Sequence, residues 1–126
     1  MLDRVDLPHT GRVESRIHTV GTVRLGEASA EIAGRAQKLQ AAWASDVPAA
    51  LHTAVDPVTT PGDAPTMLRW VTDGLVTAAT MAAVLAPGNT APDVTVAQEG
   101  RRLSVEVSGL GRPIRLRLST RLRPVR

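Results

Sequence analysis

Three histidines are the side chains best suited to metal binding or proton transfer, but their spacing supports neither role. His9, His18 and His52 lie far apart in the sequence and form no H-x-x-x-H or H-E-x-x-H pattern. Asp56 follows His52 at helical spacing, but it precedes a proline and so falls at the end of any short helix. A site histidine normally needs a second ligand and an orienting partner. We therefore predict no metal site and no acid–base site.

Nucleophilic catalysis and nucleotide hydrolysis have no motif in this sequence either. The chain contains no cysteine, and its serines form neither a G-x-S-x-G elbow nor an S-x-x-K pair. Its glycines form neither a G-x-G-x-x-G run nor a phosphate loop that ends in Lys-Ser or Lys-Thr. We expect a protein that is not an enzyme, binds no cofactor and has no small-molecule substrate.

The strongest chemical feature is a concentration of arginine in the last part of the sequence. Residues 101–126 hold eight arginines and one glutamate, a charge of +7, whereas the first hundred residues carry −4 and the whole chain +3. Guanidinium groups form paired hydrogen bonds with carboxylates and phosphates. The region could therefore attract an acidic protein or nucleic acid. A solvated sheet face, whose charges prevent edge-to-edge aggregation, explains the same residues.

Alternating apolar and polar side chains position these arginines on strands. Three alternating segments separated by glycine-bearing turns predict a three-stranded antiparallel meander, with two-residue loops at 99–100 and 110–111. The predicted register pairs only apolar residues on one face: Val96 with Leu103, Val94 with Val105, Val107 with Ile114, Val105 with Leu116, and Leu103 with Leu118.

The other face of the same meander would carry the charges. Glu106 faces Arg115 and Ser104 faces Arg117 on the predicted register, so one alignment explains both faces. The residues predicted to contact an acidic partner or phosphate are Arg102, Arg115, Arg117, Arg121 and Arg123. Single-stranded nucleic acid is a poor ligand for this face, because such sheets stack bases on aromatic side chains and this one has none.

Upstream of the meander, we expect one strand and two or three helices. Residues 12–25 are rich in β-branched side chains and predict a strand bent at Gly21, which joins an edge of the sheet. From Glu27, apolar residues recur at spacings of three and four and predict an amphipathic helix that ends or kinks at Pro48. A second short helix would then continue through Val55. The helical stripe is Ala28, Ile32, Ala36, Leu39, Trp43 and Val47.

The longest predicted helix follows a proline-rich loop at residues 56–66. It begins at Asp63 or Thr66 and runs to about Ala86, with Leu68, Val71, Leu75, Ala79, Ala82 and Leu85 along one side. Residues 75–86 carry no charge, so this helix must be covered on more than one side, by the sheet and by another helix or a second subunit. The residues predicted to mediate self-association are Gly74, Ala78, Met81, Ala82 and Val84.

The predicted fold is therefore a single α+β domain over residues 1–126, with residues 1–11 loosely ordered. Its small antiparallel sheet comprises the meander and the first strand at an edge, with the helices packed on one face. The composition, 43% hydrophobic and 21% charged, suits one globular domain of 126 residues. No secretory signal and no membrane-spanning apolar run is evident, which favours a cytoplasmic location.

The function most consistent with these features is that of a non-catalytic interaction or assembly protein. It would be a homo-oligomer or bind a protein partner, with the uncharged helix or an open strand edge for self-association and the arginine face for an acidic partner. The alternative is a small DNA-associated protein that contacts phosphates through the arginine-rich ribbon.

Overall fold

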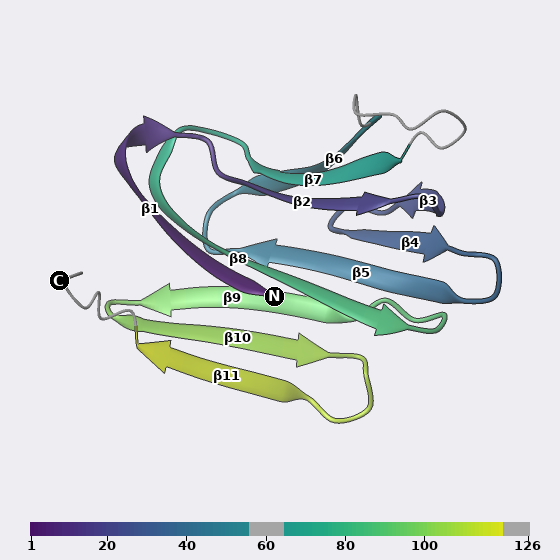
Figure 1. Cartoon of the computed structure of the whole chain (residues 1–126). Helices are drawn as coiled ribbons and strands as arrows, with labels where there is room; N and C mark the ends of the chain where they lie inside the picture. The colour runs from purple at the N-terminus through teal and green to yellow at the C-terminus, as the bar shows by residue number, and fades with distance from the viewer. Residues whose placement is uncertain (56–64, 120–126) are drawn as a thin grey trace, which may run out of the picture.

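A computed structural model describes residues 1–55 and 65–119, and every regular element in them is a β-strand. The prediction of an α+β fold with two to three helices is therefore wrong. Within the described residues, eleven strands form three antiparallel sheets (Figure 1). The strands are β1 (Leu2–Gly11), β2 (Glu14–Thr19), β3 (Thr22–Leu25), β4 (Ser29–Ala33), β5 (Lys38–Ser45), β6 (Ala49–Val55), β7 (Thr66–Thr72), β8 (Val76–Pro87), β9 (Asp93–Glu99), β10 (Arg102–Ser108) and β11 (Ile114–Ser119).

The three sheets form layers, with a five-stranded central sheet between two three-stranded sheets (Figure 1). The strand orders are β1-β8-β5-β4-β3 in the central sheet, β2-β7-β6 in the upper sheet and β11-β10-β9 in the lower sheet. On β8, Met81 packs in one apolar cluster with Leu68 and Trp70 of the upper sheet. Its neighbour Ala82 packs in a second cluster with Val105 of the lower sheet. The central sheet thus separates two apolar cores.

Strand β8 takes the place of the longest predicted helix, and β7 takes the place of its first turns. Successive side chains of a strand point to opposite faces. Ala79 and Ala83 therefore lie in the upper core and Ala82 lies in the lower core, and all three are buried. A strand covered on both faces has no place for a charge, and its apolar run resembles that of a buried helix. Residues 75–86 therefore lack charge because β8 lies between two sheets.

The first predicted helix is replaced by the β4–β5 hairpin, and the short second helix is replaced by β6. Ala30 and Ile32 on β4 and Ala41 and Trp43 on β5 are all buried, each pair with the two-residue spacing of a strand. A turn at residues 34–37 joins the two strands and is closed by a backbone hydrogen bond of 2.9 Å. The apparent helical spacing arose because each of the two strands alternates apolar residues and the turn between them shifts the pattern.

The first 25 residues form three strands in two sheets. Residues 2–11, expected to be loosely ordered, form β1 and pair with β8 at the edge of the central sheet. The single strand predicted over residues 12–25 is divided into β2 of the upper sheet and β3 of the central sheet. Gly21 lies between them, where a Cβ atom would come within 2.9 Å of the Ala33 carbonyl oxygen and of Ile32 Cγ2. Glycine is needed there because the backbones approach so closely.

One arginine on β1 fastens the lower sheet to the central sheet. Arg4 Nη1 donates hydrogen bonds to Thr80 Oγ1 at 3.0 Å and to Gln98 Oε1 of β9 at 2.8 Å. The same nitrogen lies 3.3 Å from Asp46 Oδ2. Asp46 is itself fixed, because its Oδ1 accepts a 2.8 Å hydrogen bond from the backbone N–H of Thr80. The guanidinium therefore joins three segments that are far apart in sequence.

The C-terminal meander is confirmed as β9, β10 and β11. Strands β10 and β11 have the predicted register, including Leu103 with Leu118 and Glu106 with Arg115. The register of β9 with β10 was predicted wrongly by two residues, because the loop is 100–101 and Val96 faces Val105. Gly100 has φ of 59° at the first loop position, as a type II′ turn requires. A shift of two residues keeps every side chain on its predicted face.

Two substitutions on β8 distinguish the layered strand from a helix. Ala83→Leu introduces three carbon atoms into the upper core and should lower the free energy of unfolding by about 1–3 kcal/mol. Leu85 is 51% exposed, so Leu85→Ala should lower it by less than about 1 kcal/mol. Urea denaturation followed by tryptophan fluorescence measures both. The opposite ranking would support the helix, in which Leu85 belongs to the buried stripe.

Candidate functional site

The outer face of the lower sheet collects the arginines that the sequence singled out. Leu103, Val105 and Val107 of β10 are buried. The alternate residues of β10 therefore point away from the central sheet. Their register neighbours on β11 are Arg115 beside Glu106, Arg117 beside Ser104, and Ser119 beside Arg102. We call this side of β9, β10 and β11 the outer face.

The three described arginines of the outer face differ in their partners. Arg115 forms a salt bridge with Glu106 across the two strands, and both side chains are about half exposed. Such an exposed pair contributes little to stability. Arg102 and Arg117 have no ion pair or hydrogen bond with any residue that the structure describes. Their guanidinium groups are therefore the ones left to bind a ligand. Arg121 and Arg123 lie outside the described residues.

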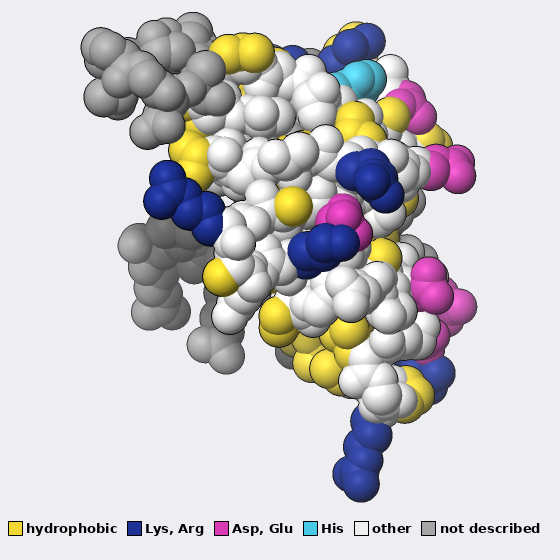
Figure 2. Space-filling view, turned by 90° about the vertical axis from the view of Figure 1, so that its right-hand side faces the viewer, with side chains coloured by type: hydrophobic (Ala, Val, Ile, Leu, Met, Phe, Trp, Pro, Cys, Tyr) yellow, Lys and Arg dark blue, Asp and Glu magenta, His cyan; other side chains and the backbone are white. Residues whose placement is uncertain are grey.

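Carboxylates are interspersed with the arginines on this face. Val94 and Val96 of β9 pack in the lower core, so the alternate residues Asp93 and Glu99 lie on the outer face. Strand pairing sets Glu99 beside Arg102. Only Glu106 was expected on this face from the sequence, although the alternation of β9 also indicates Asp93 and Glu99 there. Seen from the right-hand side of Figure 1, the molecule carries both basic and acidic side chains, and hydrophobic side chains gather in its lower half (Figure 2).

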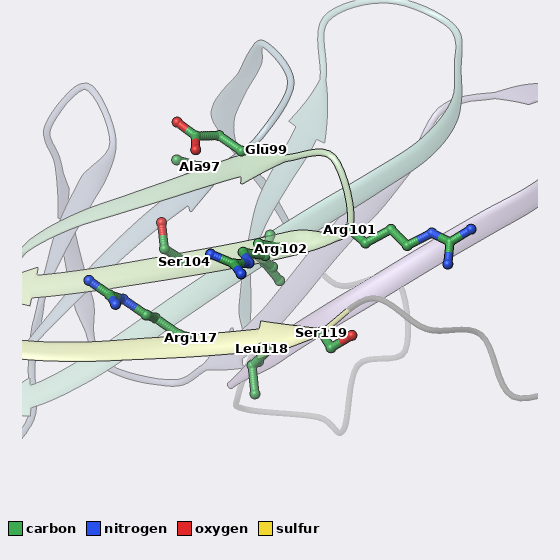
Figure 3. A pocket seen from close by; sticks show the side chains of 9 residues that line it. Ala97, Glu99, Arg101, Arg102, Ser104, Arg117, Leu118 and Ser119 are labelled. Atoms are coloured by element: carbon green, nitrogen blue, oxygen red, sulfur yellow. The ribbon is translucent and has the colours of Figure 1, made fainter.

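An open depression of about 860 Å³ lies at the end of the lower sheet near the β9–β10 turn. Figure 3 shows Glu99, Ser104 and Arg117 on one side of the sheet, whereas Leu118 points to the other side. The described residues that line the depression are Ala97, Glu99, Arg101, Arg102, Leu103, Ser104, Arg117, Leu118 and Ser119. The lining thus offers guanidinium and hydroxyl donors, with a single carboxylate, to a ligand that carries acceptors.

A smaller hollow of about 140 Å³ lies at the opposite end of the β10–β11 hairpin. Glu106 and Arg115 line it together with Ile114 and Pro113. Because the two charged side chains pair with each other there, the hollow offers no unpaired charge of either sign from these two residues. The outer face therefore has one end where arginines outnumber carboxylates and one end where Asp93 adds a second carboxylate to the pair of Glu106 and Arg115.

The predicted self-association residues do not form a surface. Met81 and Ala82 are 3% exposed and face opposite layers of this chain. Ala78 and Val84 are half-buried on the same strand, and Gly74 lies in the turn that precedes β8. These five residues would share one face only if the segment were a helix. In the strand, Met81 and Ala82 are buried within this chain, so a second copy cannot contact them.

A second charged group occupies the outer side of the upper sheet. Glu14 of β2 accepts a 2.7 Å hydrogen bond from Arg69 Nη2 of β7, and it also forms a salt bridge with Arg16. The hydrogen bond from Arg69, together with Arg16, lowers the pKa of Glu14 below its usual value. The same hydrogen bond raises the pKa of Arg69. These charges satisfy one another within the chain, so we assign them a structural role.

The histidines are distributed over the described strands. His9 lies on β1, His18 on β2 and His52 on β6. His52 pairs in register with Arg69, and His18 pairs with Met67. Among the described residues, no group of three histidine, aspartate or glutamate side chains could hold a metal ion. Nor does this part of the chain contain a helix with the length and apolarity that crossing a membrane requires.

Comparison with known proteins adds no functional assignment. No family model matches the sequence, and no curated protein matches it. A layered β-architecture supports many functions, so function has to be argued from the chemistry of a particular surface. The outer face of the lower sheet is the described surface with uncompensated cationic groups around a depression.

The Glu14 ion pairs predict a pH-dependent contribution to stability. Because the pKa of Glu14 is lowered in the folded state, its ionised form stabilises the fold at neutral pH, and this contribution is lost as the pH falls through that pKa. Glu14→Gln should therefore have a lower Tm than the wild type at pH 7. The two Tm values should converge between about pH 5 and pH 3.

The control is Glu27→Gln, which removes an exposed carboxylate outside the strands. Its Tm should follow that of the wild type throughout the titration. A difference between Glu14→Gln and the wild type that persists undiminished in acid would contradict an electrostatic role for Glu14.

Proposed function

We propose that this protein is a non-catalytic interaction protein that binds an acidic protein partner through the outer face of its lower sheet. The observation that supports this most directly is the pair Arg102 and Arg117. Both are exposed, both line the same depression, and neither has a partner among the described residues. Uncompensated guanidinium groups on a rigid sheet are well suited to paired hydrogen bonds with carboxylates.

The mixture of charges on the outer face favours a protein partner over duplex DNA. Arg102, Arg115 and Arg117 share the face with Asp93, Glu99 and Glu106, so its described strand positions carry no net charge. Binding to a phosphate backbone depends on neutralising many negative charges at once, and acidic side chains oppose it. A protein surface can match an alternating pattern charge by charge.

The chemistry of the depression supports binding rather than catalysis. Its described lining has two serine hydroxyls and one carboxylate, and it includes no imidazole. Guanidinium groups stay protonated near neutral pH, so they orient and neutralise a ligand without exchanging protons. General acid–base catalysis would need a titratable pair within hydrogen-bond reach of a reacting atom. The described lining of the depression offers hydrogen-bond donors and does not contain such a titratable pair.

A titration with two polyanions tests this proposal. Labelled poly-L-glutamate and a duplex of about 20 base pairs are each titrated with the wild type and with the double variant Arg102→Ala/Arg117→Ala, at several salt concentrations. The double variant should bind poly-L-glutamate about three- to tenfold more weakly, as expected for two exposed ion pairs. Arg35→Ala, which removes an exposed arginine from the turn between β4 and β5, should bind as the wild type does.

Two results would contradict the proposal. No binding of poly-L-glutamate at low salt, or an equal loss in the Arg35→Ala control, would remove the outer face as an acidic-partner site. Tighter binding to the duplex, with a steep salt dependence that is lost in the double variant, would instead support the DNA-associated alternative.

A further inference from the structure

Strand β11 ends the lower sheet with an open edge. It pairs with β10 along one side, and no described strand pairs with its other side. Figure 1 shows β11 as the strand of the lower sheet farthest from the central sheet. In an edge strand, alternate residues point their backbone N–H and C=O groups away from the sheet. Ile114–Ser119 therefore offers hydrogen-bonding groups to a further strand.

The apolar side chains of β11 are only partly covered. Ile114, Leu116 and Leu118 are 49%, 49% and 44% exposed, although their cross-strand partners on β10 are buried. Three adjacent half-exposed aliphatic side chains on one strand form a continuous apolar row. Another strand beside β11 would cover this row and extend the lower core.

The arginines of β11 indicate the charge of a strand that would pair with its open edge. Arg115 already has Glu106 on its β10 side, but Arg117 has Ser104 there. Side chains directly opposite each other on paired strands lie on the same face. A carboxylate on an added strand would therefore lie beside Arg117 on its open side. The same strand would place a second carboxylate beside Arg115.

We propose that β11 binds an extended segment of a partner protein as a fourth strand of the lower sheet. Apolar side chains of the segment pack beside Ile114, Leu116 and Leu118, and the intervening aspartate or glutamate side chains pair with Arg115 and Arg117. Recognition by strand addition gains affinity from backbone hydrogen bonds and specificity from alternate side chains. This inference rests on the proposed function and names the form of the acidic partner.

A second copy of the chain is a poor occupant of this edge. An antiparallel pair of β11 strands that keeps the apolar rows together must also place the arginine rows together. With Leu116 at the centre, Arg115 of one copy faces Arg117 of the other. Shifts of two residues set Arg115 against Arg115 or Arg117 against Arg117. Like charges directly opposite each other destabilise a strand pair.

The test uses three labelled peptides that differ in one property at a time. The cognate peptide is Gly-Ser-Val-Glu-Val-Glu-Val-Gly-Ser. One control replaces its glutamates with lysine, and the other replaces its valines with serine. Fluorescence anisotropy with the full chain should show the cognate peptide binding at least about tenfold more tightly than either control, because only it satisfies both rows of β11. Amide hydrogen exchange should then slow at alternate residues of Ile114–Ser119.

A charge exchange provides the matched variant. Arg117→Glu should lose at least about tenfold in affinity for the cognate peptide and gain affinity for the lysine peptide. Arg35→Glu, which reverses an exposed charge away from the lower sheet, should leave both affinities unchanged. Retained amide protection of β10 in Arg117→Glu verifies that the meander is intact.

The outcomes separate this inference from the proposed function. If the serine peptide binds as tightly as the cognate peptide, or if β11 amides stay unprotected, strand addition is wrong although the acidic-partner function stands. If neither acidic peptide nor poly-L-glutamate binds, the proposed function itself fails. A dimer in which β11 amides are protected without any peptide would overturn the argument against a second copy.

Discussion

The architecture depends on one strand that is buried on both faces. Strand β8 separates the upper core from the lower core, so neither set of its alternate side chains can carry charge. Small side chains such as Ala79, Ala82 and Ala83 allow the backbones of the flanking sheets to approach closely. The outer strands then need only one apolar face each, which leaves their other faces for charges. The amphipathic alternation of β10 and β11 is therefore a consequence of the way the central layer is packed.

The sequence predicted strands well in β10 and β11, where one face is buried and the other meets water, but it missed β1 and β6. In β10 and β11, the alternation of Leu103, Val105 and Val107 with polar residues has a single period, which fixes the face that each side chain takes, and the predicted register of these two strands is confirmed. In β8 the alternation vanishes because both faces are apolar, and the alanine-rich run then resembles a helix. In β4 and β5, two short runs joined by a turn imitate helical spacing. Whether these segments form strands depends on burial by residues that are far away in the sequence, and a local pattern does not contain that information.

The candidate surface was predictable in part for the same reason. Alternation placed Arg102, Arg115 and Arg117 on one face, and the register confirms the pairing of Arg115 with Glu106. The partial exposure of Ile114, Leu116 and Leu118 was not predictable, because it depends on how far the central sheet extends beneath the lower one. The acidic residues Asp93 and Glu99 modify the surface from a basic patch to an alternating pattern. This pattern suits a complementary protein surface better than the phosphate backbone of a DNA duplex.

The upper core is larger than the lower core, and this difference affects the order in which the sheets unfold. Among the residues that the structure describes, ten buried residues form the upper core, whereas three form the lower core. Arg4 adds a polar link across the thinner interface through Thr80 and Gln98. The least protected cooperative unit is consequently the β9–β11 layer, which will detach under heat or mechanical load before the remaining strands melt. Binding at the proposed surface would then be lost while most of the fold persists.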